Sequence, residues 1–268
     1  MPTPTSPFPD PRTWVERIID RVAKNEGPDG FNSQNRNRDG QGLSWGIIQW
    51  AQGPGSLGKL LQAMNARDPY AFLWIFGEGK QSVVDELLAK TTGARNPAAT
   101  YINGYRLYDP YWTSKFTAAS THPAFREVQI EEAVNDAHFQ AAIRISNILG
   151  IDTERALLVF YDASVQHGPN GAPNMAADIA DEVAGEDHDS ILRAFAEQTW
   201  DAMRRATRPA ELVTSRGNIW KQVGNEWHLF TKKGEDLYHI VRNRREPMLT
   251  ERGWSSEPVD WHDYQSLV

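Results

Sequence analysis

Apolar residues recur at helical spacing along most of this chain, and this periodicity limits the possible folds more than any other feature. Segment 12–26 places its large apolar residues three or four positions apart, so that they share one face of a helix, which Gly27 and Pro28 end. The chain is therefore predicted to be mainly helical, although the last sixty residues show no clear period. The same helical spacing returns in segments 57–64, 83–88, 122–149, 152–167 and 188–206.

One region departs from this pattern. Residues 27–42 are rich in glycine and asparagine, which favour turns, and residues 43–50 (LSWGIIQW) return to apolar and β-favouring types. We therefore expect a small β-hairpin element beside the first helix, in an α+β fold weighted towards helix. A loop rich in Gly, Asn, Pro and Tyr (91–111) is predicted to connect two lobes. The predicted organisation is a flexible proline-rich leader at 1–11 and one bilobal catalytic domain over 12–268.

Composition excludes several classes of protein. The chain contains no cysteine, which rules out disulfides, thiolate metal sites and cysteine nucleophiles. No apolar stretch approaches the roughly 18 residues that a membrane span needs, so we expect no membrane insertion. The first residues lack the basic and apolar regions of a signal peptide. The formal net charge of −7 argues against nonspecific binding of nucleic acid, and we expect a monomer.

Two carboxyl groups in unlike surroundings lie just before the polar loop and within it. Glu26 ends a helix whose apolar face is buried, and burial disfavours the charged form of a carboxyl group, which suits a general acid. Asp39 lies in a glycine-rich, solvated turn, where it stays ionised. Glycoside hydrolysis requires such a pair across a groove. A glutamate at a helix end and an aspartate before glycine are also common without this chemistry, so the spacing alone leaves both interpretations open.

Three segments carry a resemblance to a known family. They are 39–48 (DGQGLSWGII), 131–140 (EEAVNDAHFQ) and 157–171 (LLVFYDASVQHGPNG). In this order they resemble the family-46 chitosanases of the lysozyme superfamily. The resemblance covers residues 26–171 and fades after about residue 190. It implies a bilobal lysozyme-like fold in which a small β-hairpin lies beside the catalytic helix.

The resemblance also implies roles for single residues. Glu26 stands at the position of the general acid, and Asp39 stands at that of the base that activates water. Ser44 replaces a threonine whose hydroxyl holds that water. Asp162 stands in a buried charge network that supports the acid, with Arg216 as its expected partner. Members of the family act with inversion at the anomeric carbon.

Further side chains near these segments are expected to bind substrate. The tryptophan at the centre of the apolar segment offers a flat ring for stacking on a sugar, although most tryptophans are core residues. Two interpretations are open for the histidine that ends helix 152–167. It contacts substrate, or it is placed there because a histidine interacts favourably with the negative end of the helix dipole. The candidate set is Arg36, Arg38, Trp45, Gln49, Ser56 and His167.

No metal or cofactor is predicted. The seven histidines form no HExxH motif or other ligand pair in the sequence, which argues against zinc. Residues 35–40 imitate the start of a calcium-binding EF-hand loop, but Gly46 stands where that loop needs a bidentate glutamate. No nucleotide-binding or serine-hydrolase motif occurs in the sequence. The predicted chemistry therefore rests on carboxyl groups and a hydroxyl.

These observations predict an endo-acting, inverting glycoside hydrolase that cleaves β-1,4 bonds of an amino-sugar polymer outside the cytoplasm, with an unknown export route. Peptidoglycan is favoured as substrate, because Arg36, Arg38 and neighbouring basic residues favour an anionic glycan. Ser56 also replaces the aspartate with which chitosanases bind amino groups. Chitosan is the alternative substrate. A third hypothesis is an inactive glycan-binding module on the same scaffold, against which the two carboxyl groups and the Ser44 hydroxyl argue.

Overall fold

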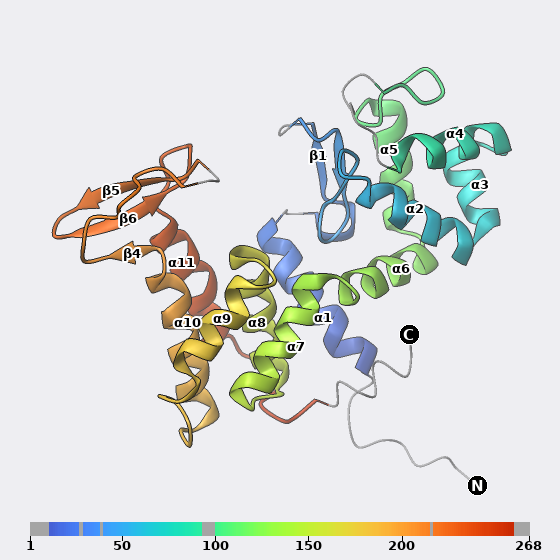
Figure 1. The fold of residues 1–268 in the computed structure, drawn as a ribbon. Coiled ribbons are helices and arrows are strands. Elements are labelled where there is room, and N and C mark those ends of the chain that lie inside the picture. The colour runs from blue at the N-terminus through green and yellow to red at the C-terminus, as the bar shows by residue number, and fades with distance from the viewer. Residues whose placement is uncertain (1–10, 27–28, 38–39, 93–99, 215–216, 260–268) are drawn as a thin grey trace, which may run out of the picture. The chain divides into compact units, whose positions relative to one another are not determined.

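The chain folds into two compact units in a computed structural model, which describes residues 11–26, 29–37, 40–92, 100–214 and 217–259 (Figure 1). Val15–Asn135 form one unit, here called the N-terminal unit. Asp136–Val268 together with Met1–Trp14 form the other, here called the C-terminal unit. Among the described residues, both units are mainly helical, as the periodicity predicts, and each contains a small antiparallel sheet. None of the described helices is long and apolar enough to cross a membrane.

The N-terminal unit combines the predicted β element with a group of helices. Its elements are α1 (Pro11–Glu26, which begins before the unit), the 3-10 helix η1 (Gly30–Asn32), β1 (Gln34–Arg36), β2 (Leu43–Trp45), β3 (Trp50–Ala51), α2 (Ser56–Arg67), α3 (Pro69–Gly77), α4 (Gln81–Thr91), α5 (Pro110–Ser120) and α6 (Pro123–Val134). Helix α2 is central, since it contacts α3, α4, α6 and β3. Gly58 of α2 lets the end of α4 approach the α2 backbone closely, because a Cβ at position 58 would lie 2.6 Å from the backbone of Thr91.

The C-terminal unit surrounds one buried helix. Its elements are α7 (Ala137–Leu149), α8 (Glu154–His167), α9 (Gly171–Ala180), α10 (His188–Asp201), β4 (Arg204–Arg205), β5 (Ile219–Val223), β6 (Glu226–Phe230) and α11 (Leu237–Thr250). Helix α8 contacts α7, α9, α10 and α11, and most of its residues are buried. Strand β6 lies between β4 and β5 and pairs antiparallel with both. Figure 1 shows this second sheet in orange beside the start of α11.

The structure corrects two sequence predictions about where the chain changes direction. The sequence predicts one helix over 122–149, whereas the structure has α6 and α7 with a break at Asn135 and Asp136. Asp136 has an extended backbone and accepts a hydrogen bond from the His138 N–H, which starts a new helix. The predicted connection between lobes, 91–111, lies inside the N-terminal unit, and the units divide between Asn135 and Asp136 instead.

Buried apolar residues explain why the described part of that connection belongs to the N-terminal unit. Ile102 and Leu107 are both fully buried. The indole N–H of Trp112, which is also fully buried, donates to the carbonyl oxygen of Ile102 at 3.0 Å. These few apolar side chains fix the segment to the core. The prediction of a connection between lobes rested on the many turn-forming residues and did not take them into account.

The N-cap of α7 yields a stability prediction. Asp136→Ala should lower the free energy of unfolding by about 1 kcal/mol at pH 7, because the first turn of α7 loses its side-chain acceptor. Asp136→Asn is the matched control, since asparagine keeps an acceptor, and it should lose less. Urea unfolding followed by circular dichroism measures both differences.

The same residue predicts how this stability depends on pH. Burial raises the pKa of Asp136, but hydrogen bonds from the His138 side chain and backbone outweigh burial, so the pKa lies below its ordinary value. A carboxylate with a lowered folded-state pKa stabilises the protein above its unfolded pKa of about 4, and that stability is lost as the pH falls through the folded-state pKa. The deficit of Asp136→Ala should therefore shrink at pH 2, and an equal deficit at both pH values would contradict this account.

Candidate active site

Ser44 lies at the centre of the small sheet in the N-terminal unit. The register of β2 places it between Asn35 on β1 and Ala51 on β3, and its side chain is buried. The predicted acid, Glu26, is the last residue of α1, as the sequence predicts, and the structure describes its backbone position but not its side chain. The predicted base, Asp39, lies outside the described residues. The roles of all three residues stay predictions.

The described residues around position 39 form a closed turn between β1 and β2. Asn37 has a φ of 61°, its carbonyl oxygen accepts from the Gly40 N–H at 3.4 Å, and its side-chain oxygen accepts from the Gly42 N–H at 2.9 Å. Gly40 and Gly42 both have a φ of 79°, a conformation that favours glycine. The glycines of the sequence motif at 40 and 42 thus adopt backbone conformations that other residues reach only with strain.

A second turn, at residues 46–49, is fixed by a buried amide on α6. The side-chain oxygen of Gln129 accepts from the Ile47 N–H at 3.1 Å, and its side-chain N–H donates to the Phe31 carbonyl at 3.4 Å. Gly46 has a φ of 89°, and a Cβ there would lie 2.6 Å from the Gln129 oxygen, so only glycine fits. The sequence analysis missed Gln129, which lies 82 residues from Ile47, and no local pattern marks it.

The structure places Trp45 in the core of the N-terminal unit, which corrects its expected role as a sugar platform. Its side chain is 0% exposed, and its ring centroid lies 5.0 Å from that of Phe116. The aromatic contacts continue from Phe116 to Phe76 at 5.3 Å. A ring without an exposed face does not stack on a sugar. Tyr105, by contrast, stacks on Tyr111 at 4.5 Å and keeps 46% of its surface exposed.

Gln49 and Ser56 both contact backbone next to the sheet. The Gln49 side-chain N–H donates to the carbonyl oxygens of Ser33 and Gly46, at 3.0 and 3.1 Å. The Ser56 hydroxyl accepts from the Ala51 N–H at 2.9 Å and donates to the Ala51 carbonyl at 3.3 Å. These contacts hold the 46–49 turn and join β3 to the start of α2. Substrate contact by either residue stays a prediction.

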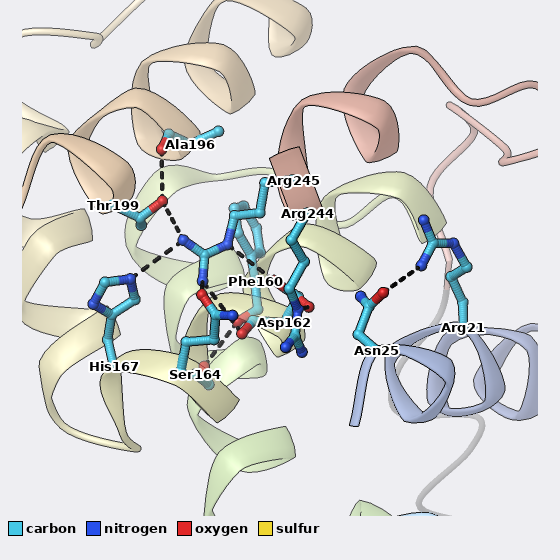
Figure 2. A network of polar contacts seen from close by, with 11 residues as sticks. Arg21, Asn25, Phe160, Asp162, Ser164, His167, Ala196, Thr199, Arg244 and Arg245 are labelled. Carbon is cyan, nitrogen blue, oxygen red and sulfur yellow. Dashed lines mark hydrogen bonds and ion pairs between the residues drawn. The ribbon is translucent and has the colours of Figure 1, made fainter. Parts of the chain in front are cut away.

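Asp162 lies at the centre of a buried charge cluster in the C-terminal unit (Figure 2). Its carboxylate projects from α8 and is fully buried. Arg244 of α11 donates to one carboxylate oxygen, and Arg245 donates to the other at 3.0 Å. The sequence analysis missed both arginines, because nothing in the last sixty residues indicated a partner for α8. Arg216, the expected partner, lies outside the described residues, so that pairing stays a prediction.

Arg245 is fully buried, and its hydrogen bonds match the capacity of the guanidinium group. Its Nε bonds to Asp162, one terminal nitrogen bonds to Thr199 and His167, and the other bonds to Gln166 and to the Asp162 carbonyl. Five N–H donors thus meet five acceptors. Burial lowers the pKa of Arg245 to about 10, and the charge of Asp162 opposes this effect. The group therefore stays charged at neutral pH.

His167 belongs to this cluster. Its Nε2 lies 3.2 Å from a terminal nitrogen of Arg245. Because a guanidinium group only donates, Nε2 of His167 is the acceptor, and the imidazole carries no proton there. The cluster joins α8, which carries Asp162 and His167, to α10 through Thr199 and to α11 through Arg245. These contacts show that His167 helps to join α8 to α11, and substrate contact by His167 stays a prediction.

Comparison with known proteins identifies the family of this arrangement. The model of Glycosyl hydrolase family 46 matches residues 22–226. The structure is similar to the family-46 chitosanase of Gynuella sunshinyii in complex with chitotetraose, with 21% identity, a TM-score of 0.50, and coverage of 91% of this chain and 89% of that chain. It is also similar to a chitosanase from Bacillus subtilis MY002 with 6 GlcN, at 17% identity and a TM-score of 0.45, covering 72% of this chain and 78% of that one. None of the curated proteins matches the chain.

The charge cluster predicts a large stability effect. Asp162→Asn should lower the free energy of unfolding by about 3–5 kcal/mol, because it leaves the buried Arg245 without a counterion. The control is Asp187→Asn, at the exposed N-cap of α10, where asparagine caps equally well and the change should stay within about 0.5 kcal/mol. Chemical denaturation measures both. A loss below about 1 kcal/mol for Asp162→Asn would show that Asp162 does not hold the cluster.

Proposed function

This chain belongs to glycosyl hydrolase family 46, and from that premise we propose that it is an endo-acting chitosanase, which cleaves β-1,4 bonds between the glucosamine units of chitosan. The chain is a glycoside hydrolase. The observation that supports the proposal is the match over residues 22–226, because that range includes Glu26, Asp39 and Ser44, to which the sequence motif assigns the catalytic roles. The family-46 chitosanase of Gynuella sunshinyii, to which the structure is similar, is in complex with chitotetraose.

Charge in the N-terminal unit also bears on the choice between chitosan and peptidoglycan. The comparisons give no support to peptidoglycan, which the sequence analysis favoured because of basic residues near the hairpin. Of these, Lys24 forms an ion pair with Asp20 at 2.8 Å, Arg36 is exposed on β1, and Arg38 lies outside the described residues. At the start of α2, the Ser56 hydroxyl forms hydrogen bonds with the backbone of Ala51. These bonds explain a serine at that position without reference to the charge of the substrate. A net charge of −7 favours a polycationic substrate.

The proposed mechanism needs no cofactor. Glu26 protonates the oxygen of the bond that breaks, so that the leaving sugar departs as a neutral alcohol. Asp39 removes a proton from water, and the water attacks the anomeric carbon on the face opposite the leaving group. The Ser44 hydroxyl orients that water. The product then carries the inverted anomeric configuration. Because a long polymer does not cross a membrane, we also propose that the protein acts outside the cytoplasm.

The first test compares substrates. The purified protein should release reducing ends from soluble chitosan and should leave isolated cell walls intact in a turbidity assay. Glu26→Gln should lower the rate on chitosan by roughly 10²–10⁴-fold, because it removes the proton donor.

The matched control for this variant is Glu16→Gln on the same helix, where Glu16 makes a surface ion pair with Arg126 at 3.4 Å. It should keep nearly full activity. Hydrolysis of cell walls without hydrolysis of chitosan would restore the peptidoglycan hypothesis. Binding of chitosan without hydrolysis would favour the glycan-binding module.

The second test addresses the base and the stereochemistry. Asp39→Asn should be about as inactive as Glu26→Gln, whereas Ser44→Ala should lose less, because Ser44 only orients the water. Asp29→Asn, at an exposed aspartate of the same loop region, is the control and should stay active. Proton NMR of the first product should show the α-anomer. A β-anomer, or azide rescue of Asp39→Ala with retained configuration, would remove Asp39 from the role of base.

A further inference from the structure

Two histidines and an aspartate meet at the junction of β6 and α11. His228 lies on β6, Asp236 is the N-cap of α11, and His239 lies in the first turn of that helix. Nδ1 of His228 is 2.7 Å from a carboxylate oxygen of Asp236, and Nε2 of His239 is 3.8 Å from the same oxygen. One ligand atom from each residue lies within 4.8 Å of the others. The sequence analysis found no ligand pair here, because His228 comes from a strand eight residues before Asp236.

The chemistry of these donors suits a first-row transition metal. Two imidazole nitrogens and one carboxylate oxygen form a common zinc ligand set, to which water adds the fourth position. Calcium and magnesium prefer all-oxygen sites, so they fit poorly. Zinc–ligand bonds of about 2.0–2.2 Å place neighbouring ligand atoms about 3.4 Å apart in a tetrahedral site. The His239 side chain is 61% exposed, so it has room to rotate towards the other two ligands.

A hydrogen bond orients Asp236, and a second carboxylate lies near His228. The other oxygen of Asp236 accepts from the Tyr238 N–H at 3.0 Å, which fixes the carboxylate at the helix start. Nε2 of His228 lies 3.7 Å from a carboxylate oxygen of Glu226. A ligating histidine commonly gives its second N–H to such a carboxylate. When a metal binds Nδ1 of His228, the ring proton moves to Nε2 and faces Glu226, so the proton count balances.

We propose that His228, Asp236 and His239 form a zinc site that joins β6 to the first turn of α11. The ligand positions lie after residue 226, where the match to the family model ends. His228 is only 6% exposed, and its ring packs against Tyr238 with centroids 5.4 Å apart. Zinc there stabilises the C-terminal unit and takes no part in the proposed glycan chemistry.

The test measures metal binding to the full chain, prepared without a histidine tag and treated with chelator. Isothermal titration with zinc chloride should show one site per chain, and zinc should raise the melting temperature of the wild type. Cobalt(II) should give the visible absorption of a four-coordinate site. His239→Ala and Asp236→Asn should each weaken zinc binding at least tenfold, and Glu226→Gln should weaken it about 10–100-fold. Asparagine at 236 keeps the helix cap, so Asp236→Asn folds normally.

The matched control is His188→Ala, at an exposed histidine at the start of α10 outside the cluster. It should bind zinc like the wild type. Circular dichroism verifies that each variant is folded, so the outcome does not depend on any hydrolytic activity. Absence of zinc binding in the wild type overturns the proposal. Unchanged binding in His239→Ala and Asp236→Asn, or an equal loss in His188→Ala, also overturns it.

Discussion

A buried ion pair between Asp162 and Arg245 lies where three helices of the C-terminal unit, α8, α10 and α11, meet. Both side chains are fully buried, and a charge in that position is tolerated only when it is paired and hydrogen-bonded. Because the guanidinium group has five acceptors in fixed directions, α11 has one register against α8 and α10. His239 lies on the same helix, about 9 Å from Arg245 along the axis. The docking of α11 therefore also positions the proposed zinc ligands.

In the N-terminal unit, the sequence motif that carries the predicted chemistry also fixes backbone turns. The glycines at 40, 42 and 46 supply backbone conformations that other residues adopt only with strain. Gln129 fills the space that Gly46 leaves free and satisfies the turn's backbone. The residues with predicted catalytic roles are next to these glycines in the sequence. Asp39 directly precedes Gly40, and Ser44 lies between Gly42 and Gly46. A match to such a motif thus reports a folded turn as well as a candidate site.

Sequence reasoning succeeded where the signal is local. The helix that ends at Glu26 and the helices near 57–64, 83–88 and 152–167 follow from periodicity, the small β element follows from local residue types, and the structure confirms them. It failed where a single residue or a contact between distant segments decides which secondary structure forms. Asp136 divides an otherwise continuous helical pattern, and α11 was missed because its charged residues and internal Pro247 hide its period. Strands β5 and β6 each have too few residues to show alternation clearly.

The sequence by itself determined the family and the hydrolase class, because three short segments each carry a motif within a few residues. It also determined the position of Glu26 at the end of a helix, because helical periodicity is local. Only the tertiary structure decided which arginines meet Asp162, since Arg245 lies 83 residues away. It also decided that Trp45 is a core residue and that His228 lies beside Asp236. The physical reason is that periodicity and turn chemistry act over a few residues, whereas burial and charge pairing depend on which distant segments pack together.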